Sequence, residues 1–212
     1  EAASWFLDGV FLNYNSSYLE QMLEQLLDED DSLEITRFLR AVDVRIDGFR
    51  VEKAPEWRGQ RVFVKHEVDG KGYELRLSEE SAGTQKLMGL ASFLLAALER
   101  GGTVVVDELD AKLHPKLLRY VILLFKDPEV NKSGAQLIFS SQDVSTMRND
   151  VFRRDEIWFA ARGEGEASQL WSLADIHEAN GNLVSKNAAF DKQYLSGRYG
   201  ADPYLTRIEE WD

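Results

Sequence analysis

The stretch Thr103-Val104-Val105-Val106-Asp107-Glu108 decides the fold class of this chain. Its first four residues are all β-branched and run without polar alternation, which is typical of a parallel strand buried on both faces. The strand ends in two adjacent acids, Asp107 and Glu108. Open α/β sheets bind ligands at the carboxyl ends of such strands, so the two carboxylates mark a candidate site. The alternative is a strand that simply ends in solvated acids.

The segments around this strand alternate between helix and strand. A helical period runs from Gly83 to Arg100 and ends at Gly101-Gly102, directly before the strand. We expect a helix at about 115–126, a polar loop at 126–134, and strands at 136–140, 156–161 and 169–173. This order predicts an α/β fold, with a mostly parallel sheet flanked by helices.

Two helices are predicted near the N-terminus. Asn15-Ser16-Ser17 is typical of a helix start, and an amphipathic pattern follows through Leu27. After an acidic break at residues 28–31, Ser32 is predicted to cap a second helix that ends at about Ala41. The second helix is expected to bury Leu33, Phe38 and Leu39. Together the two segments predict a small helical hairpin.

The period changes to two after Val42, which predicts three antiparallel strands with turns at Asp47-Gly48 and Asp69-Gly70. The alternating apolar residues are Val44, Ile46, Phe49, Val51, Val62, Val64, Tyr73, Leu75 and Leu77. This region is therefore expected to form an antiparallel subsheet beside the α/β part.

Composition excludes several classes of protein and site. The 212 residues include 25 basic and 37 acidic side chains, for a net charge of −12, so a basic coat for nucleic acid is excluded. A local basic patch, for example at Arg148, Arg153 and Arg154, is not excluded, although a solvated surface is the simpler interpretation. The absence of cysteine rules out disulfides and zinc–thiolate sites. No run of about 18 apolar residues predicts a membrane span.

A second candidate site precedes the long helix, at Ser81-x-Gly83-Thr84. Small residues at a helix start let backbone N–H groups approach an anion, and the helix dipole favours phosphate there. The alternative is an ordinary helix start, because serine is also a common N-cap. By itself this motif is a weak signal for phosphate binding.

Two further segments follow buried strands. Leu109-Asp110-Ala111-Lys112-Leu113-His114-Pro115 comes directly after Glu108, and its proline suits the first turn of a helix. His114 is expected to cap or orient that helix rather than to act in catalysis. Ser141-Gln142-Asp143 follows the strand at 136–140.

Together these segments resemble ABC-type ATPases, and within them the AAA-family proteins of bacterial abortive infection and phage defence, relatives of the OLD and RloC groups. The resemblance covers about residues 33–204, including the tail from Lys186 to Tyr204. It implies a P-loop NTPase fold with an ABC-type head. It also implies a cytoplasmic protein that binds ATP and Mg²⁺, forms an ATP-dependent homodimer, and controls an effector such as a nuclease; nucleic acid is a further possible partner.

The resemblance also assigns roles to residues. Asp107 and Glu108 resemble the Walker B motif, which implies that Asp107 holds Mg²⁺ and Glu108 polarises the attacking water. Ser81, Gly83 and Thr84 resemble the signature motif. That motif binds the γ-phosphate held by a partner chain, and its usual form is Ser-Gly-Gly-Gln.

Two more assignments follow. Asp110 lies in the segment that resembles the D-loop, which crosses the dimer interface. Gln142 stands where the family usually has a histidine that contacts the γ-phosphate. An uncharged Gln142 predicts slow hydrolysis.

The sequence contains no Gly-x-x-x-x-Gly-Lys-Ser/Thr phosphate loop. We therefore expect residues 1–41 to be a helical segment that continues from an N-terminal part, and residues 42–212 to be the C-terminal lobe of an ABC-type ATPase domain that is inactive by itself. A degenerate stand-alone domain is the alternative. Two other functions stay open: a DNA-repair or chromosome-maintenance ATPase of the RecF or SMC kind, and a non-hydrolysing scaffold.

Overall fold

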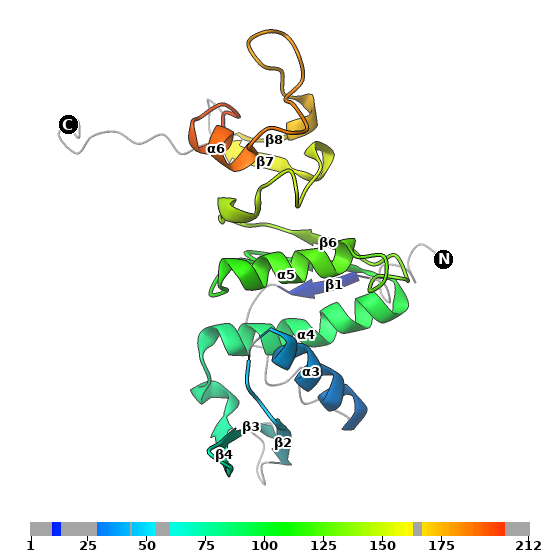
Figure 1. The fold of residues 1–212 in the computed structure, drawn as a ribbon, viewed down its shortest axis with the longest axis vertical. Coiled ribbons are helices and arrows are strands. Elements are labelled where there is room, and N and C mark those ends of the chain that lie inside the picture. Colours follow the sequence, from blue (N-terminus) through cyan, green and yellow to red (C-terminus); the bar gives the residue numbers. More distant parts are fainter. Residues whose placement is uncertain (1–9, 14–28, 43, 54–59, 163–166, 202–212) are drawn as a thin grey trace, which may run out of the picture. The chain divides into compact units, whose positions relative to one another are not determined.

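The structure is a computed structural model. It describes residues 10–13, 29–42, 44–53, 60–162 and 167–201 (Figure 1). The chain divides into two compact units, Glu1–Gln142 and Asp143–Asp212. The predicted helix at residues 15–27 lies outside the described residues, and the predicted division between residues 1–41 and 42–212 stays a prediction.

A parallel sheet forms the centre of the first unit. Its strands are β1 (Val10–Asn13), β5 (Thr103–Val106) and β6 (Gln136–Phe139), in the order β1-β5-β6. Val104 and Val106 on the middle strand are buried, at 0% and 2% exposure. The predicted α/β class is therefore confirmed, while β1 is a strand that the sequence analysis did not predict.

Two helices pack on this sheet, as predicted. Helix α4 (Ala82–Arg100) contacts β1 and β5, and α5 (Pro115–Lys126) contacts β6 (Figure 1). Gly101, with φ of 74°, ends α4 in a conformation that favours glycine. Among the described residues, no helix has the length and apolar character needed to cross a membrane.

The second sheet of this unit is antiparallel, as predicted. It contains β2 (Gly48–Lys53), β3 (Gln60–Val68) and β4 (Lys71–Arg76), in the order β2-β3-β4. Asp69 and Gly70 form the β3–β4 turn with positive φ values of 52° and 73°.

Three details of the predicted subsheet were wrong. Residues 44–46 form no strand, and Gly48 is the first residue of β2, so Asp47 and Gly48 make no turn between strands. Leu77 lies in the short 3-10 helix η2 (Leu77–Glu79). Ile46 and Leu77 are nevertheless buried, at 0% and 1% exposure, so these apolar residues belong to the core although they lie outside the strands.

Helix α3 (Glu29–Ala41) packs against α4 and differs from its prediction at the start. It begins at Glu29, so Ser32 lies inside the helix and is not its cap. Leu33 is 55% exposed, whereas Ile35, two residues later and not among the predicted buried residues, is 1% exposed. The predicted burial of Phe38 and Leu39 is confirmed.

The second unit has its own small core. Strands β7 (Trp158–Arg162) and β8 (Ser168–Ser172) pair antiparallel with each other, so the predicted parallel arrangement does not extend to them. The described part of this unit also contains the 3-10 helices η3 (Val144–Thr146), η4 (Arg154–Glu156) and η5 (Leu173–Asp175) and the helix α6 (Phe190–Leu195). Phe159 stacks on Tyr194 with ring centroids 5.7 Å apart. Burial raises the pKa of Tyr199 in this core to about 12.

Asn131 holds the loop between α5 and β6. Its Nδ2 donates to the carbonyl oxygens of Phe125 and Ala135, both at 2.8 Å. Its Oδ1 accepts from the Ala135 N–H at 2.7 Å. The loop that leads into β6 is therefore closed by one amide side chain that uses both its donor and its acceptor atoms.

We predict that Asn131→Asp lowers the free energy of unfolding by about 2–4 kcal/mol, because an ionised Asp has no donor for two carbonyl oxygens. Urea unfolding measures the change. Asn180→Asp is the matched control, because the Asn180 side chain only accepts, from the Asn182 N–H at 2.9 Å. Equal stability of the two variants would contradict the prediction.

Candidate functional site

Asp107 and Glu108 directly follow β5, and one residue of the neighbouring strand end, Ser140, holds them. The Glu108 N–H donates to Ser140 Oγ at 2.8 Å, and Ser140 Oγ donates to Asp107 Oδ1 at 2.5 Å. The backbone of Ser140 is also bound, to the Val106 carbonyl at 3.1 Å and to the Leu109 N–H at 3.0 Å. Four hydrogen bonds therefore join Ser140 to residues 106–109, and two of them reach the turn at residues 107–108, which we call the acidic turn.

The backbone of the acidic turn has an unusual conformation. Glu108 has a φ of 48°, in the left-handed region that non-glycine residues seldom adopt. Such conformations cost about 1–3 kcal/mol each and persist where the surroundings enforce them. Here the surroundings are Ser140 on one side and the fully buried Leu109 on the other. The side chains of Asp107 and Glu108 remain exposed.

Asp107 is chemically suited to Mg²⁺. Its exposed carboxylate is a hard oxygen donor, and Ser140 fixes one of its two oxygens. In the part of the chain that the structure describes, no group of three His, Asp or Glu side chains could hold a metal by itself. Mg²⁺ commonly uses one or two carboxylates and completes its shell with water and substrate phosphates. The residues present therefore fit a Mg²⁺ ion that is held together with a nucleotide.

The segment at residues 81–84 starts helix α4. Ser81 is its N-cap: Ser81 Oγ accepts from the Thr84 N–H at 3.1 Å and lies 2.8 Å from Thr84 Oγ1. The ordinary N-cap interpretation is thus confirmed. Because Ser81 is exposed and Gly83 and Thr84 are partly exposed, the cap leaves this helix start accessible.

A histidine from β3 ties the antiparallel sheet to this helix start. His66 Nε2 lies 2.6 Å from Glu80 Oε1, and His66 Nδ1 lies 2.9 Å from the Arg45 carbonyl oxygen. Gln85 Nε2 donates to the Glu80 carbonyl at 2.7 Å, from the other side of Ser81. The residue before Ser81 is therefore fixed through both its side chain and its backbone.

Gly83 allows the helix start to approach the loop after the acidic turn. A Cβ atom at Gly83 would lie only 2.8 Å from the Lys112 carbonyl oxygen, a backbone atom. Lys112 itself has a φ of 64°. Gly83 is thus required by packing within one chain, in addition to any role toward a phosphate.

Lys86 is a cation that the sequence analysis did not identify. Its Nζ donates to the Glu108 carbonyl oxygen at 2.5 Å from the second turn of α4. Burial lowers the pKa of Lys86, and the carboxylates of Asp110, Glu108 and Asp107 oppose that shift. The sequence signal was a lysine within one turn of a phosphate-type helix start, which is too common to be specific.

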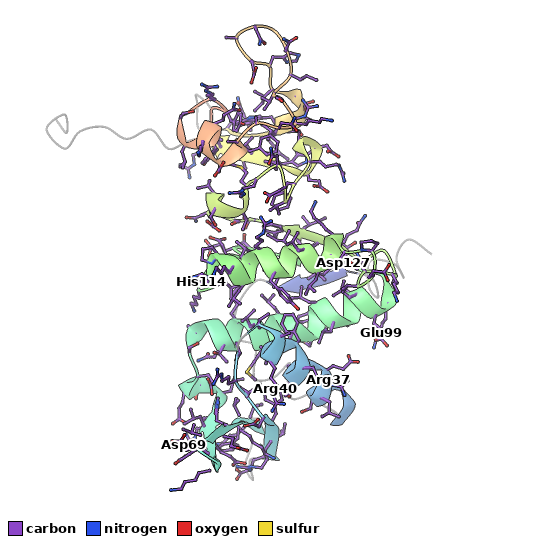
Figure 2. All side chains as sticks on the ribbon, in the orientation of Figure 1. Arg37, Arg40, Asp69, Glu99, His114 and Asp127 are labelled. Carbon is purple, nitrogen blue, oxygen red and sulfur yellow. The ribbon has the colours of Figure 1, made fainter. Side chains whose placement is uncertain are left out.

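Asp110 and Gln142 also come together. The Gln142 N–H donates to Asp110 Oδ1 at 3.3 Å, which links the segment after β5 to the segment after β6. His114 is the N-cap of α5: its Nδ1 accepts from the Lys116 N–H at 3.1 Å, as the cap interpretation predicted (Figure 2).

The structure therefore gathers most of the predicted site residues at one edge of the sheet. Asp107, Glu108, Asp110 and Gln142 lie at the carboxyl ends of β5 and β6. Ser140 and Lys86 are additional members of the site, each joined to the acidic turn by hydrogen bonds. Gly83 reaches the group through Lys112, while Ser81 and Thr84 pair with each other.

Comparisons with known proteins show the family of the chain. Residues 2–148 match the family described as "AAA domain, putative AbiEii toxin, Type IV TA system". No curated protein matches the chain. A solved structure from work on the ATP-driven dimerisation and DNA-stimulated activation of SMC ATPases is similar, with 16% identity and a TM-score of 0.47 over 74% of this chain and 89% of that chain.

We predict that Gly83→Ala lowers the free energy of unfolding by about 1–3 kcal/mol, because the new methyl group overlaps a backbone oxygen that moves only with its loop. Gly72→Ala is the matched control, since a Cβ atom there meets nothing within 4 Å and its φ is not positive. Urea unfolding of both variants tests the prediction. A Gly83→Ala protein as stable as the control would show that the two loops separate without cost.

Proposed function

Because the chain belongs to the AAA domain family that is described with the AbiEii toxin of type IV toxin–antitoxin systems, we propose that it forms part of an ATPase that controls an effector in bacterial anti-phage defence. The observation that carries this proposal is the acidic turn, in which Ser140 and Lys86 fix the backbone while two carboxylates stay exposed. Carboxylates held in place by hydrogen bonds and open to solvent are suited to hold a metal ion and to accept a proton from water.

Each residue of the acidic turn has a separate task in this proposal. Asp107 holds Mg²⁺, with one carboxylate oxygen fixed by Ser140 and the other available. Glu108 accepts the proton of the attacking water, because it is an exposed carboxylate next to the metal position. ATP supplies the phosphoryl group that is transferred to water.

The segment at residues 81–84 acts toward a second copy of the chain. It starts a helix of 19 residues, its backbone N–H groups carry the positive end of the helix dipole, and Ser81 is exposed. An anion held by a partner chain is a suitable ligand for such a helix start. The protein would then dimerise only when nucleotide is bound, with Gln142 beside the nucleotide of its own chain and Asp110 at the dimer interface.

The effector and the cellular role are the least direct parts of the proposal. The family description mentions a toxin of a toxin–antitoxin system, which supports control of a toxic partner such as a nuclease in the cytoplasm. Direct contact with nucleic acid receives less support, because acids within the same unit neutralise two of the three candidate arginines. Arg148 pairs with Asp150 at 3.0 Å, and Arg153 pairs with Asp155 at 2.8 Å.

Two alternatives make different predictions. A RecF- or SMC-type ATPase would be stimulated by DNA, whereas a non-hydrolysing scaffold would bind ATP without turnover. Because the sequence has no Gly-x-x-x-x-Gly-Lys-Ser/Thr loop, residues 1–212 alone should hydrolyse ATP hardly at all. The experiments below therefore use the full-length protein.

We predict that Glu108→Gln keeps ATP binding and lowers turnover by roughly 10²–10⁴-fold, because Gln can orient a water molecule but cannot take its proton. Steady-state ATPase assays and nucleotide-binding titrations measure the two quantities. Glu129→Gln is a suitable control, since Glu129 is an exposed loop residue after α5. Unchanged turnover in the Glu108→Gln variant would remove Glu108 from the role of base.

We predict that Ser81→Arg abolishes ATP-dependent dimerisation while the monomer stays folded, because a large side chain then occupies the exposed helix start. Light scattering with and without ATP measures the dimer fraction, and Ser81→Asn, which can still cap the helix, serves as the conservative comparison. If the Arg variant dimerises as the wild type does, a partner's phosphate does not bind at Ser81.

A further inference from the structure

Lys86 occupies a position that an ordinary surface lysine does not. It is half-buried, and its Nζ is 2.5 Å from the carbonyl oxygen of Glu108, the residue with the left-handed backbone. Asp107, Glu108 and Asp110 are close enough to stabilise its charge. Removing an ammonium group from water is unfavourable unless nearby partners compensate, so this placement requires the acidic turn.

Lys86 also belongs to the same rigid element as Ser81. Both lie in the first two turns of α4, where the Gln85 N–H donates to the Ser81 carbonyl at 2.9 Å. A displacement of the helix start therefore moves the Lys86 backbone with it. The close approach of Gly83 to Lys112 provides a second contact between α4 and the loop that follows the acidic turn.

In the proposed dimer, the start of α4 and the acidic turn contact different nucleotides. The helix start at Ser81 faces the nucleotide of the partner, and Asp107 and Glu108 face the nucleotide of their own chain. Lys86 connects the helix that starts at Ser81 to the acidic turn, because its Nζ donates a hydrogen bond to the Glu108 carbonyl oxygen. This arrangement is suited to transmit occupation of one site to the conformation of the other.

We propose that Lys86 is a positioning residue, which holds the Glu108 backbone and links the nucleotide-contacting start of α4 to the acidic turn. The identity of the ligand in this inference rests on the proposed function. The hydrogen bond between Lys86 and Glu108 is independent of that function. Lys86 keeps the Glu108 carbonyl in place, and through it the direction of the Glu108 carboxylate. A nucleotide at the helix start thereby tightens the acidic turn of the same chain.

The experiment compares Lys86→Met, Lys86→Arg and a control, Lys132→Met, in the full-length protein. Methionine keeps the length and loses the donor, whereas arginine keeps a charged donor. Lys132 is exposed in the loop between α5 and β6 and provides the same substitution away from the site. Two measurements are made: amide hydrogen exchange of residues 107–113 with and without Mg²⁺ and a non-hydrolysable ATP analogue, and the kcat and KM for ATP.

We predict faster exchange of residues 107–113 in Lys86→Met, and a loss of the slowing that the analogue causes in the wild type. The kcat should fall by roughly 10- to 100-fold, the usual cost of a misplaced catalytic group, while KM changes little. Lys86→Arg should recover most of both properties, and Lys132→Met should behave as the wild type. A general loss of folding would instead speed exchange throughout the chain and would not be rescued by arginine.

Wild-type exchange of residues 107–113 in the Lys86→Met variant would overturn the inference. So would an unchanged kcat in a protein whose wild type hydrolyses ATP. If the wild type neither binds nor hydrolyses ATP, the proposed function fails, and with it the link to a nucleotide. The exchange measured without the analogue still decides whether Lys86 holds the acidic turn.

Discussion

The hydrogen bonds between Ser140 and the acidic turn are the interaction on which the candidate site depends. Parallel pairing brings β5 and β6 to end at the same edge, but pairing alone leaves the following residues free to diverge. Ser140 prevents this by binding the acidic turn with its hydroxyl and the flanking residues Val106 and Leu109 with its N–H and its carbonyl. The unfavourable conformation of Glu108 persists because this neighbour satisfies the polar groups of the turn.

The second support of the site comes from α4, and it is electrostatic as well as steric. The carboxylates of Asp107, Glu108 and Asp110 favour the charged form of Lys86, which comes from the helix. Gly83 lets the same helix approach the loop at Lys112. A helix start that would serve a phosphate and a turn that would serve a metal are therefore parts of one packed unit.

The parts of the fold that the sequence predicted are those with long, regular patterns. The β-branched run at β5 and the apolar periods of α4 and α5 indicated their elements almost to the residue. β1 was missed because four residues carry little pattern, and its pairing with β5 joins segments about 90 residues apart. Ser140 was missed because nothing in the sequence Ser-Ser-Gln-Asp distinguishes one serine from the other. The register of β5 and β6 identifies Ser140 as the residue that lies beside the acidic turn.

The contact between Asp110 and Gln142 bears on the role proposed for Gln142, which would stand where the resembled family has a histidine. Asp110 accepts from the backbone N–H of residue 142, not from its side chain. Any residue except proline offers that donor, so the loop after β6 keeps this link whichever side chain stands there. A change from histidine to glutamine therefore alters the chemistry available to a phosphate without removing the loop's attachment to the site. In the proposed ATPase, the backbone would therefore determine where residue 142 lies, and its side chain would determine how strongly it acts on the phosphate.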